Sequence, residues 1–311
     1  MLYPKKDVVK RYKGNPILGP DSLPYSIQGI YNSGATKYKD KYIMLLRVES
    51  IDITNYFFVA ESRDGYDFKV KEKPIELIGA GEEYAKYTNQ MIYDPRITKI
   101  GETYYITFAC HSSWSVRIGM IKTDDFEKFH WVDFLSEVDN RNCTLFPEKI
   151  NGLYARLDRP ILPNDHGDIW ISYSPDLIYW GRSKCIMKHG EHGGWNWIKI
   201  GPGAPPIKTK HGWLEIWHGV HQMCKAQYVY HLGAMLLDLQ DPSKILACTK
   251  APILSPVTDY ERIGISYSVT FTSGAILEDN GEVKIYYGAG DTYQCVGTST
   301  VDDLVDACYN R

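Results

Sequence analysis

Single polar side chains stand at comparable places in five short, mostly apolar stretches of the sequence. They are Asn32, Asp94, Arg141, Lys199 and either Thr270 or Thr272. If the five stretches lie side by side around one axis, these side chains point toward it. One acid and two cations then meet, and a surplus of cations suits a small anion, of which phosphate is the commonest.

Each of these residues also has a purely structural interpretation. A single Arg or Lys at the start of a strand is most often part of a surface ion pair. Asp94-Pro95-Arg96 is, taken alone, a credible turn or ion-pair sequence. The anion site therefore depends on the five positions being structurally equivalent.

Two pairs of histidines have the content of a metal site. His189 and His192, and His218 and His221, are each separated by two residues. Neither pair has a carboxylate partner at helical spacing, so we expect no metal site and read these histidines as ordinary side chains.

Two further segments have weaker chemical signals. The stretch 201–203 is Gly-Pro-Gly, but it lacks the helix and the Lys-Ser/Thr of a phosphate-binding loop. Trp195 and Trp197 follow two glycines. They either stack against a sugar or belong to a buried aromatic cluster.

The elements that must position these residues form a repeat. In each copy a turn with Gly or Asp leads into an alternating, aromatic strand, and another strand follows. The copies start near residues 36, 97, 148, 207 and 275, a period of about fifty to seventy residues. Alternation at period two is typical of half-buried antiparallel strands. Each copy fits a four-stranded sheet, and five such sheets around an axis form a five-bladed β-propeller.

A β-sandwich with accidental self-similarity is the alternative fold. The propeller is favoured because all five copies share the turn and the aromatic strand that follows it. We therefore expect an all-β fold, with residues 1–311 as a single five-bladed propeller domain that ends in a short helix near residues 302–308.

Composition limits the function classes. The chain has 35 Lys and Arg against 38 Asp and Glu, a net charge of −3, which gives no reason to expect nucleic acid or an anionic membrane as a partner. No secretory signal and no run of 18 apolar residues is evident, so we expect a cytoplasmic protein. The seven cysteines are widely spaced and predict reduced, mostly buried thiols: Cys110, Cys143, Cys185, Cys224, Cys248, Cys295 and Cys308.

Several motifs, taken together and in order, resemble the β-mannoside phosphorylases of glycoside hydrolase family 130. The resemblance covers nearly the whole chain. It is carried by residues 94–98, 140–142, 145–150, 159–160, 172–181, 199–207, 212–214, 218–220 and 287–291. That family is a five-bladed propeller, in agreement with the repeat.

The resemblance implies roles for individual residues. Asp94 matches the general acid, which protonates the leaving oxygen through the mannose 3-hydroxyl. The cations that match the phosphate ligands are Arg141, Arg159 and Lys199, with Lys208 as a rival to Lys199. Residues that fall where the family lines the sugar and phosphate sites are Asn32, Ser33, Arg47, His166, Tyr230 and Asp291.

These roles agree with the chemistry that a phosphorylase needs. An inverting hydrolase uses two carboxyl groups, one of them to activate water. A phosphorylase needs only the acid, because phosphate is itself the nucleophile, together with cations that hold the phosphate in line with C1. No metal or organic cofactor is required, and inorganic phosphate is the co-substrate.

The function implied is the reversible, inverting phosphorolysis of β-mannosides to α-mannose 1-phosphate, with β-1,2-mannobiose or β-1,2-oligomannosides as substrates. The alternatives are a β-1,4-mannosyl-glucose or mannooligosaccharide phosphorylase, a β-mannoside hydrolase on the same fold, and a non-catalytic sugar-binding propeller. Residues 82–87 and 190–197 are candidate acceptor loops. Aromatic residues are unusually frequent, at 13% of the chain with 24 Tyr, 8 Trp and 9 Phe, which is compatible with a homo-oligomer and does not require one.

Overall fold

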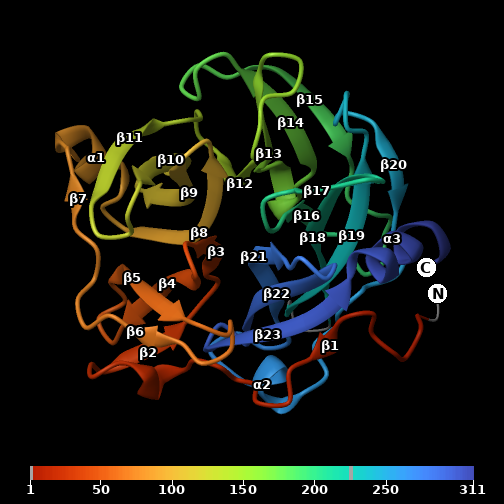
Figure 1. The fold of residues 1–311 in the computed structure, drawn as a ribbon, viewed down its shortest axis with the longest axis horizontal. Helices are drawn as coiled ribbons and strands as arrows, with labels where there is room; N and C mark the ends of the chain where they lie inside the picture. The colour runs from red at the N-terminus through yellow and green to blue at the C-terminus, as the bar shows by residue number, and fades with distance from the viewer. Residues whose placement is uncertain (1–2, 224–226) are drawn as a thin grey trace.

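Five sheets, antiparallel except for one short edge strand, stand around a central axis as the blades of a propeller (Figure 1). The computed structural model describes residues 3–223 and 227–311. The five-bladed, all-β architecture expected from the repeat is confirmed. That the whole chain forms a single domain stays a prediction, which one cooperative transition in calorimetry would support.

The first three blades follow one another along the chain. Blade 1 consists of β2 (Ile27–Ile30), β3 (Gly34–Tyr38), β4 (Lys41–Ser50), β5 (Asn55–Ser62) and β6 (Lys69–Val70). Blade 2 consists of β8 (Met91–Ile100), β9 (Thr103–Ser112), β10 (Ser115–Thr123) and β11 (Phe129–Phe134), with β7 (Leu77–Ile78) parallel to β11 at its outer edge. Blade 3 consists of β12 (Asn140–Leu145), β13 (Tyr154–Pro160), β14 (Ile169–Ser174) and β15 (Gly181–Met187).

The last two blades close the ring. Blade 4 consists of β16 (Lys199–Pro202), β17 (Ile207–Thr209), β18 (Gly212–Gln222), β19 (Tyr228–Leu237) and β20 (Ile245–Cys248). Blade 5 consists of β21 (Thr270–Leu277), β22 (Glu282–Ala289) and β23 (Tyr293–Thr300). Its outermost strand is β1 (Lys10–Arg11), which comes from the other end of the chain and pairs Lys10 with Thr298. This pairing joins the first described residues to the last blade.

Helices are few and short. They are η1 (Pro20–Ser22), α1 (Glu82–Tyr87), η2 (Pro163–Asp165), α2 (Asp259–Arg262) and α3 (Val301–Asn310). The expected terminal helix is α3, and the Thr300 hydroxyl caps it by accepting from the Asp303 N–H at 3.0 Å. None of the described helices has the length and apolar character needed to cross a bilayer.

The hydrophobic core is divided among the spaces between neighbouring blades. In β4, Ile43 and Leu45 pack toward blade 2, whereas Met44 and Leu46 pack toward blade 5. Equivalent clusters lie between blades 2 and 3, 3 and 4, and 4 and 5. Successive side chains of one strand therefore pack into two different interfaces. This is why the inner segments are apolar on both faces.

The innermost strand of every blade is interrupted near its middle. The register shifts between Tyr93 and Arg96 in β8, between Arg141 and Thr144 in β12, and between Thr272 and Gly274 in β21. In blades 1 and 4 the inner strand is split in two, as β2 and β3, and as β16 and β17. A bulge bends a strand and redirects a side chain, and bulges are common next to active sites.

The six described cysteines are free thiols: Cys110, Cys143, Cys185, Cys248, Cys295 and Cys308. Four of them are buried and two are half-buried, as expected. Burial raises the pKa of Cys143 and of Cys308 to about 12, so both thiols are protonated near neutral pH. Cys224 lies outside the described residues.

Candidate functional site

Asp94 lies at the bulge of β8, where its backbone has a left-handed φ of 55°. Its Oδ1 accepts hydrogen bonds from Asn32 Nδ2 at 3.0 Å and from the Arg47 guanidinium at 3.3 Å. Arg96 donates to the backbone carbonyls of Asp94 and Gly203, both at 2.8 Å. The carboxylate is therefore held by side chains of blade 1, and its backbone is tied to blade 4.

A second carboxylate lies on the same side of the site. Asp291 follows β22 in a left-handed conformation, with φ of 50°. Burial raises its pKa, and the Ser266 side chain and the Arg47 charge oppose that rise. We call Asn32, Arg47, Asp94 and Asp291 the acid side of the site.

Three cations gather on the neighbouring inner strands. Arg141 in β12 and Arg159 in β13 are directly opposed residues of one antiparallel pair, a placement that is unfavourable for like charges. Lys199 begins β16, on the next blade. In the described part of the chain neither guanidinium forms an ion pair with a carboxylate. We call Arg141, Arg159 and Lys199 the cation side.

The lowered pKa values on the cation side show that its positive charges lie close together. Burial, and then the charge of Arg141, lower the pKa of Arg159 to about 10. Burial, and then the charge of Arg159, lower the pKa of Lys199 to about 8, although its contact with Asp165 opposes the shift. A bound anion would relieve both effects, because it stabilises the charged forms of these groups.

His218 lies against Arg159 at 3.0 Å between its Nε2 and a guanidinium nitrogen. Burial, and then the charge of Arg159, hold the pKa of His218 far below its usual range, so the ring is neutral. Arginine can only donate, so Nε2 accepts and Nδ1 carries the proton. That buried Nδ1 has no partner among the described residues. The ring can come this close because a Cβ at Gly201 would stand 2.6 Å from His218 Cε1.

Tyr93 lies between the two sides. The guanidinium carbon of Arg47 is 5.1 Å from the centre of its ring, and that of Arg141 is 6.0 Å away. Its hydroxyl is buried and has no hydrogen-bond partner within residues 3–223 and 227–311. The acid side and the cation side therefore form one continuous site, lined by an aromatic ring.

The remaining expected site residues lie at its edges. His166 donates from Nδ1 to the Ile198 carbonyl at 2.7 Å, which places it beside Lys199. Burial raises the pKa of Tyr230, and the nearby charge of Arg159 opposes that rise. Ser33 adjoins Asn32 and is buried, but its hydroxyl donates to the Tyr31 carbonyl at 3.0 Å. The Ser33 hydroxyl therefore bonds the backbone rather than lining an open cleft.

The structure separates the two rival lysines. Lys208 lies in β17 and pairs with Glu148 at 2.6 Å, with both side chains about half exposed (52% and 48%). The Lys199 side chain is only 8% exposed. Of the two, Lys199 is the one beside Arg159.

Either Thr270 or Thr272 was expected to point toward the axis. Both residues are buried, but their hydroxyls donate to the backbone carbonyls of Tyr230 and Tyr286. Blade 5 therefore contributes Asp291 to the site in place of a threonine hydroxyl.

Of the two candidate acceptor segments, residues 82–87 are helical and residues 190–197 are a loop, and their acceptor role stays a prediction. Residues 82–87 form helix α1, at the outer edge of blade 2, where Tyr84 packs on Trp131 (Figure 1). In the second segment Trp195 is buried and stacks on Trp217, with ring centres 4.7 Å apart. The buried-cluster interpretation of Trp195 is therefore the correct one.

The histidine pairs take other partners. His189 binds the Asp168 carboxylate at 2.7 Å and stacks on His166, while His221 contacts His231 at 3.1 Å. Within the described ranges no three His, Cys, Asp or Glu side chains are grouped as a metal would need.

Three neighbours of the site were not among the expected residues: Tyr93, Asn142 and His218. Asn142 has a left-handed φ of 57° at the β12 bulge, and its buried Oδ1 has no partner in the described chain. A clue lay in the sequence, because Asn is favoured at such bulges. The sequence marked His218 only as part of a histidine pair and of the motif at 218–220, because its contact with Arg159 depends on the packing of blade 3 against blade 4.

Comparison with known proteins identifies the family and the fold of the chain. The model of the family described as beta-1,4-mannooligosaccharide phosphorylase, glycoside hydrolase family 130, matches residues 3–310. The chain is 36% identical to the beta-1,4-mannooligosaccharide phosphorylase of Ruminococcus albus, over 97% of this chain and 91% of that protein. It is 32% identical to the beta-1,2-mannobiose phosphorylase of Listeria innocua, over 91% of this chain and 94% of that protein.

A solved structure shares the fold. The beta-1,2-mannobiose phosphorylase from Listeria innocua, in complex with beta-1,2-mannobiose, superposes with a TM-score of 0.86 at 29% identity. The match covers 96% of this chain and 99% of that one. From the family model, the sequence identities and the shared propeller, the chain belongs to glycoside hydrolase family 130.

Proposed function

We propose that this protein is a β-mannoside phosphorylase, which cleaves its substrate reversibly with inorganic phosphate and releases α-mannose 1-phosphate. The observation that carries the proposal is the cation side: Arg141 and Arg159 are directly opposed, and Lys199 is buried beside them. Such a cluster is costly unless an anion joins it. The cluster lies next to Asp94 in a chain of this family, and we therefore infer that the anion is phosphate.

The two sides of the site have complementary tasks in this reaction. Asp94 supplies the proton to the leaving oxygen through the mannose 3-hydroxyl, as the family resemblance implies. Arg141, Arg159 and Lys199 hold phosphate as the nucleophile on the opposite face of C1, which inverts the configuration there. Positioning and charge stabilisation by such fixed cations are large contributions to catalysis. No metal or organic cofactor takes part.

Hydrolysis on the same fold is the second candidate. Asp291 lies near Asp94, so two carboxylates are present on the acid side, as an inverting hydrolase would need. The cations are not displaced, however, and a water nucleophile does not need three clustered positive charges, two of which, Arg159 and Lys199, are buried. This supports phosphate over water as the nucleophile.

One incubation separates these functions. The protein is mixed with β-1,2-mannobiose, with and without phosphate, and the products are identified by ³¹P and ¹H NMR. A phosphorylase releases α-mannose 1-phosphate only when phosphate is present. Free mannose in both samples indicates a hydrolase, and an unchanged disaccharide that still binds indicates a sugar-binding propeller.

For the linkage we propose β-1,2-linked mannobiose or oligomannosides. Relatives named for β-1,2 substrates and relatives named for β-1,4 substrates match this chain at similar identities, so the proposal rests on the fold match with the β-1,2-mannobiose phosphorylase. The test is the ratio of kcat/KM for β-1,2-mannobiose over β-1,4-mannobiose and mannosyl-glucose. A ratio below one would reverse the assignment.

A further inference from the structure

One carboxylate lies against the cation side. Asp165 ends the short helix η2 and pairs with the ammonium group of Lys199. The Lys199 side chain is 8% exposed, whereas that of Asp165 is 44% exposed. Lys199 thus has a partner that reaches it from the solvent side of the site.

The segment that carries Asp165 is fixed beside β16. Gly167 accepts a backbone hydrogen bond from Ile200 at 2.9 Å, and His166 donates to the Ile198 carbonyl at 2.7 Å. Asn164 and Asp165 both have left-handed φ, 62° and 58°, which turns the carboxylate back toward Lys199. The contact is thus part of the architecture of this edge and is not a chance meeting of two long side chains.

Lys199 and Asp165 are surrounded mostly by positive charge. The charges of Arg159 and Arg141, both in blade 3, lower the pKa of Lys199. The centre of the Tyr228 ring, in β19, lies 4.5 Å from the Lys199 Nζ. The Tyr228 side chain also helps to lower the pKa of Asp165, and the ring of His218 beyond Arg159 is neutral. Although burial alone would raise the pKa of Asp165, its contact with Lys199 lowers it below the usual range, so the carboxylate is charged near neutral pH.

We propose that Asp165 is a built-in counter-ion that occupies Lys199 in the empty site and competes with phosphate for it. The inference rests on the proposed phosphate site. A phosphate oxygen and the Asp165 carboxylate are both acceptors for the same ammonium group. The two anions repel each other when both lie beside it. Asp165 therefore keeps Lys199 charged and oriented before phosphate arrives, and it weakens phosphate binding, which raises the phosphate concentration at which the enzyme is half-saturated.

The test is calorimetric titration of inorganic phosphate into the full-length protein at about pH 6, with no mannoside present. At that pH Lys199 is protonated, so only the competition differs between variants. Asp165→Asn keeps the shape of the side chain and removes its charge. We expect phosphate to bind it roughly three- to tenfold more tightly than the wild type, the range of one partly exposed ion pair. Asp165→Ser should give the same change.

Glu148→Gln is the matched control. Glu148 pairs at 2.6 Å with Lys208, which is on the same blade as Lys199 but outside the site, so removing the Glu148 charge should leave phosphate binding unchanged. Equal or weaker binding to both Asp165 variants, with normal binding by the wild type, overturns the competition alone. If neither the wild type nor the variants bind phosphate while β-mannobiose still binds, both the competition and the phosphorylase proposal are overturned.

Discussion

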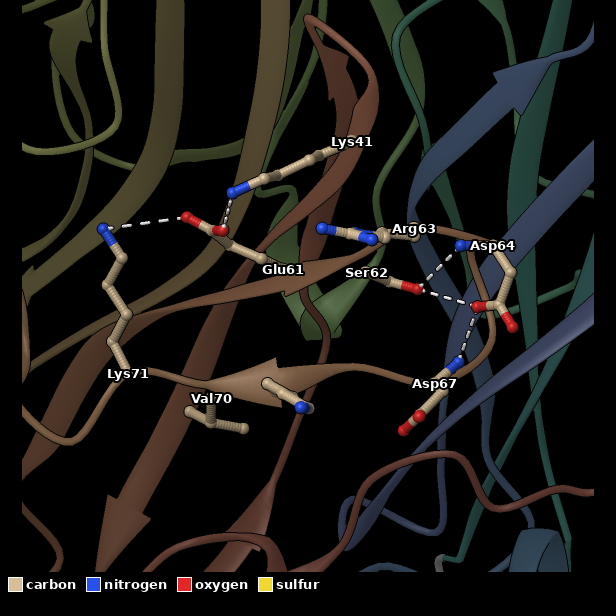
Figure 2. Close-up of a pocket in the computed structure, with 9 residues that line it drawn as sticks. Lys41, Glu61, Ser62, Arg63, Asp64, Asp67, Val70 and Lys71 are labelled. Atoms are coloured by element: carbon tan, nitrogen blue, oxygen red, sulfur yellow. Dashed lines mark hydrogen bonds and ion pairs between the residues drawn. The ribbon is translucent and has the colours of Figure 1, made fainter.

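Two regions of this protein are rich in charge, and they differ in almost every physical respect. One is the cation side of the site, at the inner strands of blades 3 and 4. The other is a surface hollow on blade 1, lined by Lys41, Glu61, Arg63, Asp64, Asp67, Lys69 and Lys71 among others (Figure 2). In the hollow, Glu61 lies 2.6 Å from Lys41 and 3.9 Å from Lys71.

The same side-chain type responds in opposite ways in the two regions. In the hollow, the hydrogen bond and the charge of Glu61 raise the pKa of Lys41. At the site, burial and the charge of Arg159 lower the pKa of Lys199 to about 8. The number of charges does not mark a binding site. Burial among like charges does, because such a cluster keeps uncompensated positive charge that an anion from outside can neutralise.

The strongest way to test this difference is to change the proposed general acid next to the cations. If Asp94 has that role, Asp94→Asn should lower turnover by a factor of roughly 10²–10⁴, the usual effect of losing a positioned general acid. The fold and phosphate binding should remain, because Asn is isosteric and the cation side is intact. Turnover is measured by release of mannose 1-phosphate, with circular dichroism as the check on folding. A variant that keeps more than about a tenth of the wild-type rate would remove Asp94 from this role.

The cations themselves come next in expected effect. Arg141→Ala, Arg159→Ala or Lys199→Ala should each raise the KM for phosphate by about ten- to a hundredfold, because a lost charge-assisted hydrogen bond costs on the order of 1.5–3 kcal/mol. The KM for the mannoside should change much less. Arg159→Lys should restore the affinity only in part, because an ammonium group cannot replace a planar fork.

A structural role for the three cations makes a different prediction. If they only stabilise the fold, the alanine variants have a lower melting temperature and the wild-type KM for phosphate. Measuring both quantities on the same three variants decides the matter.

The pH dependence of phosphate binding should report Lys199. Its pKa is lowered to about 8, so the ammonium group is present below that pH and is lost above it. The KM for phosphate should therefore rise above about pH 8, by up to about tenfold per pH unit. Lys199→Arg should move this limb to higher pH, since a guanidinium stays charged. A limb that stays in place in this variant would assign it to another group.

The hollow on blade 1 should give the smallest effect. Glu61→Gln leaves Lys41 and Lys71 without this partner, but both are exposed to water, which solvates them. We expect no change in the KM for phosphate and a shift in melting temperature of about 1–2 °C at most. A change in phosphate affinity as large as that of Lys199→Ala would contradict the distinction between the two regions.

Local features of this protein can be read from short stretches of sequence. Asp64 and Asp125 each follow a Ser or Thr by two residues, and in the structure their Oδ1 atoms accept two backbone N–H groups of the same turn. The unbroken apolar run from Ile43 to Leu46 likewise indicates in the sequence that both faces of the strand are buried. Such patterns involve neighbours along the chain or a strand period of two, so the repeat and the blade count followed from them.

The site was only partly predictable. Asp94, Arg141 and Lys199 stood at equivalent places in the repeat, so their convergence on one axis could be inferred. Arg159 came from resemblance to a family, because a single Arg-Pro has no meaning by itself. His218 and Tyr93 were missed.

Only the tertiary structure distinguished the two lysines, through their burial and their partners. Lys199 and Lys208 are nine residues apart and are chemically alike, yet one is buried beside Arg159 and the other pairs with Glu148 in water. Likewise, Trp195 became part of a buried stack only where it met Trp217. The type of each side chain and its place in the repeat are properties of the sequence. Its burial, its partners and hence its pKa depend on strands that meet only when the ring of blades closes.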